Sequence, residues 1–537
     1  TIILINSVLC PMRQASSKGE SSVIQFLLNN ELVNLDKIDP NTTVLQYLRD
    51  MRSRKGAKEG CASGDCGACT VVTVELDADN QLVYKNINAC ITFVSALNGK
   101  QLLSIEDIKP DQGLHCTQQA MVDNDGSQCG YCTPGFVMSL FALKKHQSAY
   151  DKHSVHQALA GNLCRCTGYR AIDSAAEQAL NTYAVDHFEP LIDNTKTQLA
   201  NLANNADELN IGHDTSHCHI PQNITALASL YLTHPDSTLL AGGTDLAITV
   251  TQHHQPFSRL ISLANVAELK EVSIEEKQIV IGAGVSLDEC QRLVAPFYED
   301  FSKLFDRFAS LQIRHQATLA GNIANASPIG DTPPALIALD AQLTLRKGAV
   351  QRVVSIADFF TDYRKTVLQP SEFIENIIIP TNNTTAIKDS TLLSQENFHF
   401  KIYKVSKRLD DDISAICVAC FLQLDEHQKV STIRLAYGGM AAIAKRAQQT
   451  EQALLGKAWN IENVAQSVTQ LSNDFQPMSD FRASNRYRLL CAENLLYKFF
   501  HESQHSLAGD DNDDLTSKGI DPKIQRSHLK TRISDYV

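Results

Sequence analysis

Four cysteines and the glycines between them carry the first chemical signal of the chain. The segment from Gly60 to Cys69 has the spacing C-x4-C-x2-C, and a fourth cysteine follows later, which gives the set Cys61, Cys66, Cys69 and Cys90. This spacing is typical of loops that bind a plant-type [2Fe–2S] cluster through four thiolates. Glycines inside such a loop allow positive φ and let backbone N–H groups approach the sulfurs. The alternative is zinc, but zinc ribbons use two C-x2-C knuckles.

A second set of four cysteines follows in a region with helical periodicity. It consists of a C-x2-C pair and a distant C-x-C pair: Cys129, Cys132, Cys164 and Cys166. A C-x-C pair aims both sulfurs at one centre only from an extended segment or turn, because residues i and i+2 diverge on a helix. Two predicted helices between the pairs would form a hairpin that brings the four thiols together. By spacing alone these ligands fit zinc as well as an iron–sulfur cluster, whereas a redox C-x-x-C would leave the second pair unexplained.

Two loops rich in small residues are the next candidates for binding. The first, residues 239–246, follows a predicted strand and contains Gly242-Gly243. The second, residues 317–331, is rich in small and hydroxyl side chains and has few large ones that could build a core. Backbone N–H groups of such turns can face an anion such as a pyrophosphate, although a Gly-Gly pair is also common in ordinary turns. No G-x-G-x-x-G follows a strand, so a Rossmann site is not supported.

The composition limits the class of protein and its partners. The chain has 537 residues, which predicts roughly three to four domains. Its net charge of −12 argues against a nucleic-acid partner, and it has no segment apolar and long enough to span a membrane. Most of its 15 cysteines lie between residues 61 and 166, which favours metal ligation in a reducing cytoplasm over a secreted disulfide scaffold. Residues 1–11 are expected to be an unstructured extension and not a signal peptide.

Hydrophobic periodicity predicts the elements that position these motifs. A hairpin turning at Asn29-Asn30 and a helix over 43–52 precede the first cysteine loop, and strands follow it. Thr133 and Ser154 are predicted to cap the two helices of the second cysteine set. Beyond the first glycine-containing loop, strands are expected at 279–281 and 343–345 with a helix at 286–295.

Longer runs around these motifs resemble a known family. The runs 126–135 (GSQCGYCTPG) and 161–169 (GNLCRCTGY), and the order of the two cysteine sets, resemble the iron–sulfur half of the molybdenum hydroxylases. The two loops of small residues resemble the FAD domain of that family, in which paired loops hold the pyrophosphate. The family usually has Gly where this chain has Ala320. The resemblance covers about residues 23–500.

The resemblance implies a multidomain α+β fold, with domains expected in a fixed order. They are a β-grasp, plant-type ferredoxin-like [2Fe–2S] domain at 22–100, a helical [2Fe–2S] domain at 101–184, a linker at 185–220, an α+β FAD-binding domain at 221–385, an α+β C-terminal domain like that of the carbon monoxide dehydrogenase flavoprotein at 395–501, and a tail at 502–537.

The resemblance also assigns residues to cofactors. The eight cysteines would hold two [2Fe–2S] clusters. Phe308 would pack on the flavin ring, while Asp331, Ile374 and Lys404 would line the isoalloxazine, where the lysine cation would stabilise an anionic reduced flavin. The other expected FAD-binding residues are Leu239, Leu240, Ala241, Gly242, Gly243, Thr244, Asp245, Leu246, Thr318, Leu319, Ala320, Gly321 and Asn322. Tyr363 and the run Asp410–Asp412 are candidates for the nicotinamide-nucleotide side, with a charged surface loop as the alternative for that run.

By resemblance, the chain carries electrons and has no catalytic residue for hydroxylation. Electrons would come from a molybdopterin cofactor on a separate large subunit, which Gln128 would face. They would pass through the helical-domain cluster, the ferredoxin-like cluster and FAD to NAD⁺ during oxidation of hypoxanthine and xanthine to urate. Too few residues follow 501 for a molybdopterin domain, so a heterodimer or a dimer of heterodimers is expected. The alternatives are O₂ as acceptor, a large subunit acting on an aldehyde or another N-heterocycle, and a zinc-stabilised adaptor that binds no flavin.

Overall fold

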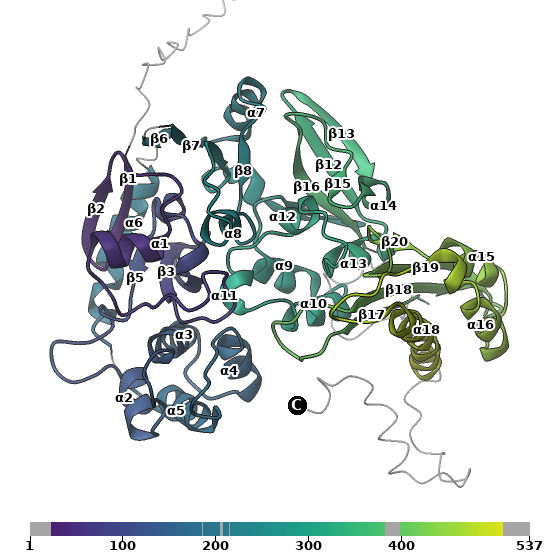
Figure 1. The fold of residues 1–537 in the computed structure, drawn as a ribbon, viewed down its shortest axis with the longest axis horizontal. Coiled ribbons are helices and arrows are strands. Elements are labelled where there is room, and N and C mark those ends of the chain that lie inside the picture. Colours follow the sequence, from purple (N-terminus) through teal and green to yellow (C-terminus); the bar gives the residue numbers. More distant parts are fainter. Residues whose placement is uncertain (1–22, 185, 205–207, 214, 382–397, 508–537) are drawn as a thin grey trace, which may run out of the picture.

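The computed structural model describes residues 23–184, 186–204, 208–213, 215–381 and 398–507. Within them the chain forms separate sheets and helical layers, so the predicted multidomain mixture of helices and sheets is confirmed (Figure 1). No helix in these ranges has both the length and the apolar character needed to cross a membrane. The predicted N-terminal extension, residues 382–397 at the boundary of the last two predicted domains, and the tail beyond 507 lie outside the described residues.

A five-stranded sheet in the order β2-β1-β5-β3-β4 builds the N-terminal unit. Only β1 and β5 are parallel, and the strands are β1 (Ile24–Leu28), β2 (Glu31–Leu35), β3 (Thr70–Leu76), β4 (Leu82–Asn88) and β5 (Gln101–Leu103). The predicted hairpin turn is present, with Asn29 at φ 54°, a conformation that asparagine tolerates. The helix predicted over 43–52 is split: α1 (Val44–Gln46), capped by Thr43, continues as a π-helical turn over Tyr47–Met51. Two 3₁₀ turns, Ala89–Ile91 and Val94–Leu97, follow β4.

Four helices form the second unit, which packs beneath this sheet. They are α2 (Cys116–Asp123), α3 (Thr133–His146), α4 (Lys152–Leu159) and α5 (Arg170–Asn181). The apolar residues of α3 pack against β3, which fixes the helices on the sheet. The predicted caps are wrong by a few residues. Cys132 is the N-cap of α3, and α4 starts earlier than predicted because the Asp151 carboxylate accepts the Ser154 N–H at 2.8 Å.

The segment predicted as a linker contains regular structure. A 3₁₀ turn over Glu189–Leu191 leads into α6 (Ile192–Asn204), and β6 (Leu209–His213) pairs with β7 (Ser216–Ile220). Since β7 also pairs in parallel with β9 (Arg259–Ser262), this hairpin is part of a sheet of the next unit, and the linker prediction is wrong there. Alternate residues of both strands are buried, a short period that the His and Asn residues between them obscure in the sequence.

The third unit has two main sheets with helices between them. One sheet has the order β6-β7-β9-β8, and the other the order β10-β11-β16-β12-β13. Besides β9, its strands are β8 (Thr238–Leu240), β10 (Val272–Ile274), β11 (Gln278–Gly282), β12 (Gln342–Lys347), β13 (Val350–Ser355), the small pair β14 (Phe360–Asp362) and β15 (Lys365–Thr366), and β16 (Phe373–Pro380). Its helices are α7 (Ile224–Thr233), α8 (Leu246–Thr251), α9 (Leu287–Val294), α10 (Glu299–Asp306), α11 (Leu311–Arg314), α12 (Leu319–Ala324), α13 (Thr332–Ala338) and α14 (Ile356–Phe359), with a 3₁₀ turn at Ala267–Lys270.

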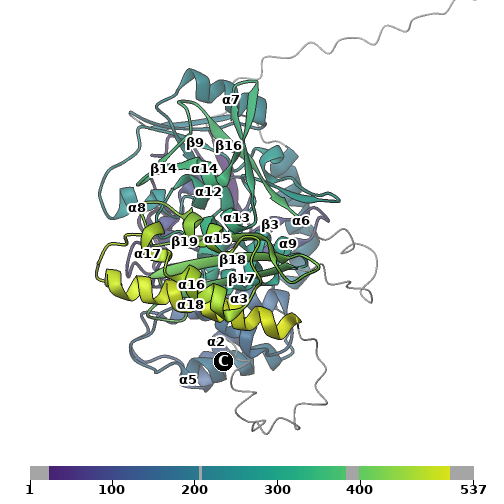
Figure 2. The ribbon, with the colours of Figure 1, turned by 90° about the vertical axis from the view of Figure 1, so that its right-hand side faces the viewer.

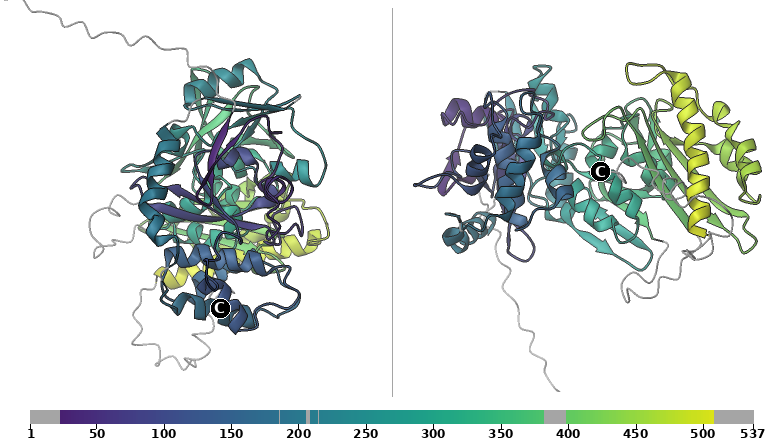
Figure 3. Two further views of the ribbon diagram at one scale, coloured as in Figure 1. Left: turned by 90° about the vertical axis from the view of Figure 1, so that its left-hand side faces the viewer. Right: turned by 90° about the horizontal axis from the view of Figure 1, so that it is seen from below.

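A four-stranded sheet covered by helices forms the C-terminal unit. Its order is β17-β18-β19-β20, with β17 (Phe398–Val405), β18 (Ile416–Leu424), β19 (Val430–Gly438) and β20 (Lys445–Arg446). The helices are α15 (Gln448–Leu454), α16 (Ile461–Val468), α17 (Leu471–Asp474) and α18 (Asn485–Leu507). Helix α18 lies across the face of β18, as Figure 2 shows, and extends beyond residue 502, where a tail was predicted. Figure 3 shows the third unit between this sheet and the two N-terminal units.

Candidate functional site

The first cysteine set lies on an irregular loop before β3, with Cys90 supplied from the turn after β4. The Sγ atoms of Cys69 and Cys90 are 3.2 Å apart, and the thiols of Cys66 and then Cys90 lower the pKa of Cys61. The fold therefore brings all four predicted ligands of this set together.

The second set is assembled by the helical unit. Cys129 and Cys132 precede α3, whereas Cys164 and Cys166 follow α4, and these two helices pack as a hairpin. Burial, and then the Cys164 thiol, raise the pKa of Cys132 to about 12, and the Cys129 thiol raises the pKa of Cys166, so the thiols interact in these two pairs. Cys129 and Cys166 are exposed, and so is the neighbouring Gln128, so this set lies at the protein surface.

Polar hydrogens point at the sulfurs in both sets. The N–H groups of Ser63 and Asp65 donate to Cys61 Sγ at 3.4 and 3.3 Å. In the second set the Thr167 hydroxyl donates to Cys164 Sγ at 3.2 Å. Such donors stabilise negative charge on sulfur, which thiolate ligands require.

The arrangement fits a two-iron centre in each set. All 14 cysteines in the described ranges are free thiols. Within those ranges no three His, Cys, Asp or Glu side chains are arranged around a point as ligands of one metal ion. The Cys69–Cys90 contact and the two interacting pairs of the second set suit a [2Fe–2S] cluster, which needs two thiolates on each of its two irons.

A large cavity of about 1730 Å³ is lined by residues of the third and C-terminal units and, on another side, by residues of the helical unit such as Leu163 and Tyr169. Its lining includes 13 of the 17 residues predicted to bind FAD: Leu239, Ala241, Gly242, Gly243, Thr244, Asp245, Leu246, Phe308, Thr318, Gly321, Asn322, Asp331 and Lys404. Residues far apart in the sequence are therefore brought to one site. Ser63 and Asp65, on the first cysteine loop, also line it.

Four of the predicted residues do not line the cavity. Leu240, Leu319, Ala320 and Ile374 are at most 5% exposed and belong to hydrophobic cores. Any contact between these residues and a bound flavin would come from backbone atoms. Tyr363 is also absent from the lining and is 58% exposed, whereas its neighbour Arg364 is part of it.

The two loops of small residues pack directly on each other. A Cβ atom at Gly242 would lie 2.0 Å from the carbonyl oxygen of Gln316, so only glycine fits there. On the second loop the Thr318 hydroxyl accepts the Gly321 N–H at 3.0 Å and starts α12. The result is a cradle of backbone with few side chains, which suits a pyrophosphate.

A buried ion pair lies at the far wall of the cavity. Lys404 Nζ donates to Asp331 Oδ2 at 2.7 Å, and the Ser414 hydroxyl donates to Asp331 Oδ1 at 2.6 Å. Both side chains of the pair are less than 10% exposed. Arg307 holds the adjacent segment by donating to the carbonyl oxygens of Lys404 and Leu409, at 2.8 and 3.1 Å. A cation is therefore fixed where a flavin ring could be placed against Phe308.

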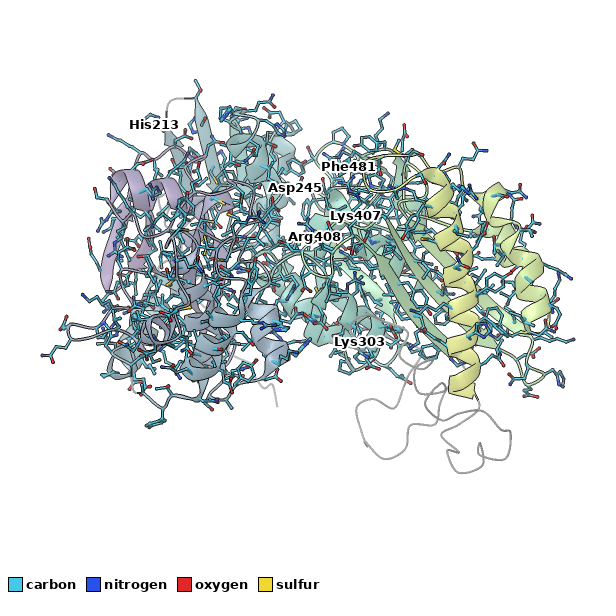
Figure 4. All side chains as sticks on the ribbon, turned by 60° about the horizontal axis from the view of Figure 1, so that its bottom comes forward. His213, Asp245, Lys303, Lys407, Arg408 and Phe481 are labelled. Atoms are coloured by element: carbon cyan, nitrogen blue, oxygen red, sulfur yellow. The ribbon has the colours of Figure 1, made fainter. Side chains whose placement is uncertain are left out.

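Charged residues border the cavity opening. Figure 4 shows Asp245 on one side and Lys407, Arg408 and Phe481 on the other, and all four are part of the lining. Burial, and then the charge of Asp65, raises the pKa of Asp411 to about 6. Asp65 and Asp411 line the same cavity, so the first cysteine loop faces the C-terminal unit across it.

Hydrogen bonds tie the first cysteine loop to the third unit. The Thr251 hydroxyl donates to Ala62 O and Gln252 Nε2 donates to Cys61 O, both at 2.7 Å. Thr251 ends α8, the helix that leaves the first cavity loop. Sequence reasoning missed these residues and Arg307, because polar side chains with no motif around them give no signal before the fold is known.

Family models match the chain in four consecutive stretches. They describe a 2Fe-2S iron-sulfur cluster binding domain at 19–95, a [2Fe-2S] binding domain at 104–177, an FAD binding domain in molybdopterin dehydrogenase at 210–382 and a CO dehydrogenase flavoprotein C-terminal domain at 401–503.

Curated relatives match nearly the whole chain. A xanthine dehydrogenase of Emericella nidulans is 30% identical, and the match covers 89% of this chain and 38% of the relative. A xanthine dehydrogenase of Drosophila subobscura is 31% identical, and the match covers 83% of this chain and 37% of the relative. A xanthine dehydrogenase/oxidase of Rattus norvegicus is 29% identical, and the match covers 94% of this chain and 41% of the relative. The chain thus spans about two fifths of the length of these relatives.

Solved structures match about half of the chain. A carbon monoxide dehydrogenase chain from Hydrogenophaga pseudoflava is 24% identical with a TM-score of 0.47, covering 52% of this chain and 93% of that one. A chain of quinoline 2-oxidoreductase from Pseudomonas putida is 22% identical, also with a TM-score of 0.47, covering 53% and 96%.

These domain matches define the class of protein. The chain carries two [2Fe–2S] domains followed by a flavoprotein module. It belongs to the molybdenum hydroxylase family, as an iron–sulfur and FAD chain that transfers electrons.

Proposed function

We propose that this chain is the electron-transfer part of a xanthine dehydrogenase, taking electrons from a molybdopterin-bearing partner domain or chain and delivering them to NAD⁺. One observation carries the proposed order of transfer. The first cysteine loop is in contact with both other centres: Leu163 of the second set donates its N–H to Cys66 O at 3.0 Å, and the α8 region holds Cys61 and Ala62. The first set is therefore linked both to the second set and to the cavity, into which Ser63 and Asp65 of its loop project, and this linkage supports the proposed order.

The residues of the chain fit two clusters and one FAD. The proposed ligands are Cys61, Cys66, Cys69 and Cys90 in one set and Cys129, Cys132, Cys164 and Cys166 in the other. Flavin suits the junction because, when bound, it accepts electrons singly and releases them as a hydride. The two loops of small residues would hold the pyrophosphate. Lys404, held by Asp331, would place a positive charge beside the ring, and Phe308 would pack on it.

The partner would approach at the second cysteine set. Cys129, Cys166 and Gln128 are exposed there, which leaves this end open to an incoming electron. The relatives named xanthine dehydrogenase are more than twice as long as this chain, consistent with a further domain or a partner chain that carries molybdopterin. We propose a heterodimer or a dimer of heterodimers in the cytoplasm, where the free thiols would stay reduced.

The acceptor would bind at the cavity opening. The proposed nicotinamide side includes the run Asp410–Asp412, which lines the cavity near the cations Lys407 and Arg408. The proposed substrates, hypoxanthine and xanthine, would be bound by the partner, since the residues identified here serve electron transfer.

Co-purification with the molybdopterin-bearing partner tests the proposal. The complex should reduce NAD⁺ when given xanthine, and a Cys66→Ser variant should stop NAD⁺ reduction while leaving substrate reduction of the molybdenum centre intact. A complex that oxidises an aldehyde or another N-heterocycle but not xanthine would contradict the proposed substrate. One that reduces O₂ but not NAD⁺ would contradict the proposed acceptor.

A further inference from the structure

A buried polar junction joins the two cysteine loops to the FAD domain. We define it by Gly67 from the first cysteine loop, Gly135 and Ser139 from α3, Gly161 and Asn162 before Cys164, and Gln312 from α11. Asn162 is 2% exposed and both Ser139 and Gln312 are fully buried. Three units of the fold therefore meet at one almost completely buried point, which borders the cavity at Asn162.

The backbones at this junction approach as closely as glycine permits. A Cβ atom at Gly67 would lie 2.3 Å from Gly161 O, and one at Gly135 would lie 2.2 Å from Gly67 O. A Cβ atom at Gly161 would lie 2.4 Å from Gln312 Oε1. Contacts this close leave no room for sliding, so the loops of the two cysteine sets are held at one separation.

The Asn162 amide fills the centre of the junction. In the orientation that satisfies all its neighbours, its nitrogen donates to Gly67 O at 3.3 Å and Gly135 O at 3.2 Å. Its oxygen accepts from Gln312 Nε2 at 3.0 Å and from the Ser139 hydroxyl at 2.9 Å. One side chain thus links both cysteine loops and the FAD domain.

The next residue provides the direct connection between the two sets. Leu163 N–H donates to Cys66 O at 3.0 Å, and Leu163 is adjacent to Cys164. A route from one sulfur to the other therefore runs along the Cys66 backbone, across one hydrogen bond and along the backbone of 163–164. A carbonyl and an N–H are held at this distance only while the loops keep their places.

We infer that Asn162 is the positioning residue for electron transfer between the two cysteine sets, because its amide fixes the loops that carry Cys66 and Cys164. This inference rests on the proposed function. Transfer of one electron makes and breaks no bond, so its rate depends on the separation of the centres and on the atoms between them. A side chain that fixes this separation therefore affects the rate without touching iron.

The sharpest test is Asn162→Asp in the full chain. Aspartate keeps the shape and can still accept from Gln312 and Ser139, but it cannot donate to the carbonyls of Gly67 and Gly135. Asn162→Ala is the second variant, since it removes the amide without adding charge. Asn88→Ala is the matched control. Asn88 is also buried and holds only the first set, donating to Gly64 O at 2.9 Å and accepting from the Cys69 thiol at 3.8 Å, and within the described residues its side chain makes no hydrogen bond to the second set.

Three measurements separate positioning from assembly. Iron and flavin content show whether the centres load, low-temperature EPR of the reduced chain reports magnetic coupling between the clusters, and flavin bleaching after rapid reduction by a viologen radical reports the transfer rate. Electron tunnelling falls off exponentially with distance, so a small displacement of the two loops should slow bleaching severalfold in both Asn162 variants. The EPR coupling should weaken in both. Asn88→Ala should keep the coupling.

The outcomes are distinct. Loaded Asn162 variants with wild-type coupling and bleaching rate would overturn the inference while leaving the proposed function intact. Wild-type chain without iron or flavin would overturn the proposed function first. If one Asn162 variant does not bind its iron and flavin, the coupling and bleaching rate of the other variant test the inference. An equal loss of coupling in Asn88→Ala would also refute a role specific to Asn162.

Discussion

Removing Lys404 should destabilise the contact between the FAD domain and the C-terminal domain. Asp331 starts α13, whereas Lys404 and Ser414 belong to the C-terminal domain, and the pair is almost completely buried. In Lys404→Met the carboxylate keeps only its hydrogen bond from Ser414. Breaking a buried pair by removing one partner costs about 3–5 kcal/mol, because the remaining charge stays buried without compensation.

This penalty should appear in the melting of the flavoprotein module. Each kcal/mol of lost stability lowers the Tm of a domain of this size by about 2–4 °C. The lower limit of the penalty, about 3 kcal/mol, therefore predicts a fall in Tm of roughly 6–12 °C. Calorimetry of the full chain measures it. The double variant Lys404→Met/Asp331→Leu should recover much of the loss, because no lone charge remains.

Lys303→Met is the matched control for this prediction. Lys303 pairs with Glu299 across one helical turn, but the two side chains are 51% and 74% exposed, so its removal should change stability by no more than about 0.5 kcal/mol. A Tm for Lys404→Met that equals that of Lys303→Met would refute the reasoning. So would a double variant less stable than Lys404→Met alone.

Three further perturbations test other parts of the site. Gly242→Ala should weaken FAD binding by roughly 5- to 150-fold, because its methyl group would meet the Gln316 carbonyl and overpacking costs about 1–3 kcal/mol. FAD titration measures the affinity, and Gly113→Asn, at a glycine in open space, is the control. Unchanged affinity in Gly242→Ala would contradict the close packing of the loops. Cys66→Ser should lose about half of the iron and one of two EPR signals while keeping FAD, so retention of both signals would contradict the ligand assignment. In the folded chain the pKa of Asp411 is raised to about 6, so its carboxyl group holds a proton more tightly than it does in the unfolded chain. The free energy of unfolding should therefore fall as the pH rises from about 4 to 6. Asp65, Arg408, Lys404 and Arg314 act on this group, and Asp411→Asn should flatten that part of the Tm–pH curve; equal slopes in both proteins would speak against it.

The cysteine sets were predictable because their chemistry is local. Thiol spacing within a loop limits which sulfurs can reach one centre, and the helices between the two pairs of the second set could be recognised from periodicity. The two cavity loops were predictable for a similar reason, since small residues without core-forming neighbours indicate exposed backbone.

The remaining parts depend on contacts between distant residues. Ile374 shows this clearly: an apolar residue in a strand faces either the core or a ligand, and only the sheet decides, here by pairing β16 with β12 so that Ile374 is buried. Asn162 and Gln312 are separated by about 150 positions, and no pattern along the chain connects them. The β6–β7 hairpin was mistaken for linker because polar residues alternate with its buried ones.

Metal and flavin analysis of the intact purified chain tests the central claim most directly. About four iron atoms with matching labile sulfide and about one FAD per chain are expected, with two distinct [2Fe–2S] EPR signals after reduction. Zinc in place of iron, or iron without extractable flavin, would contradict it.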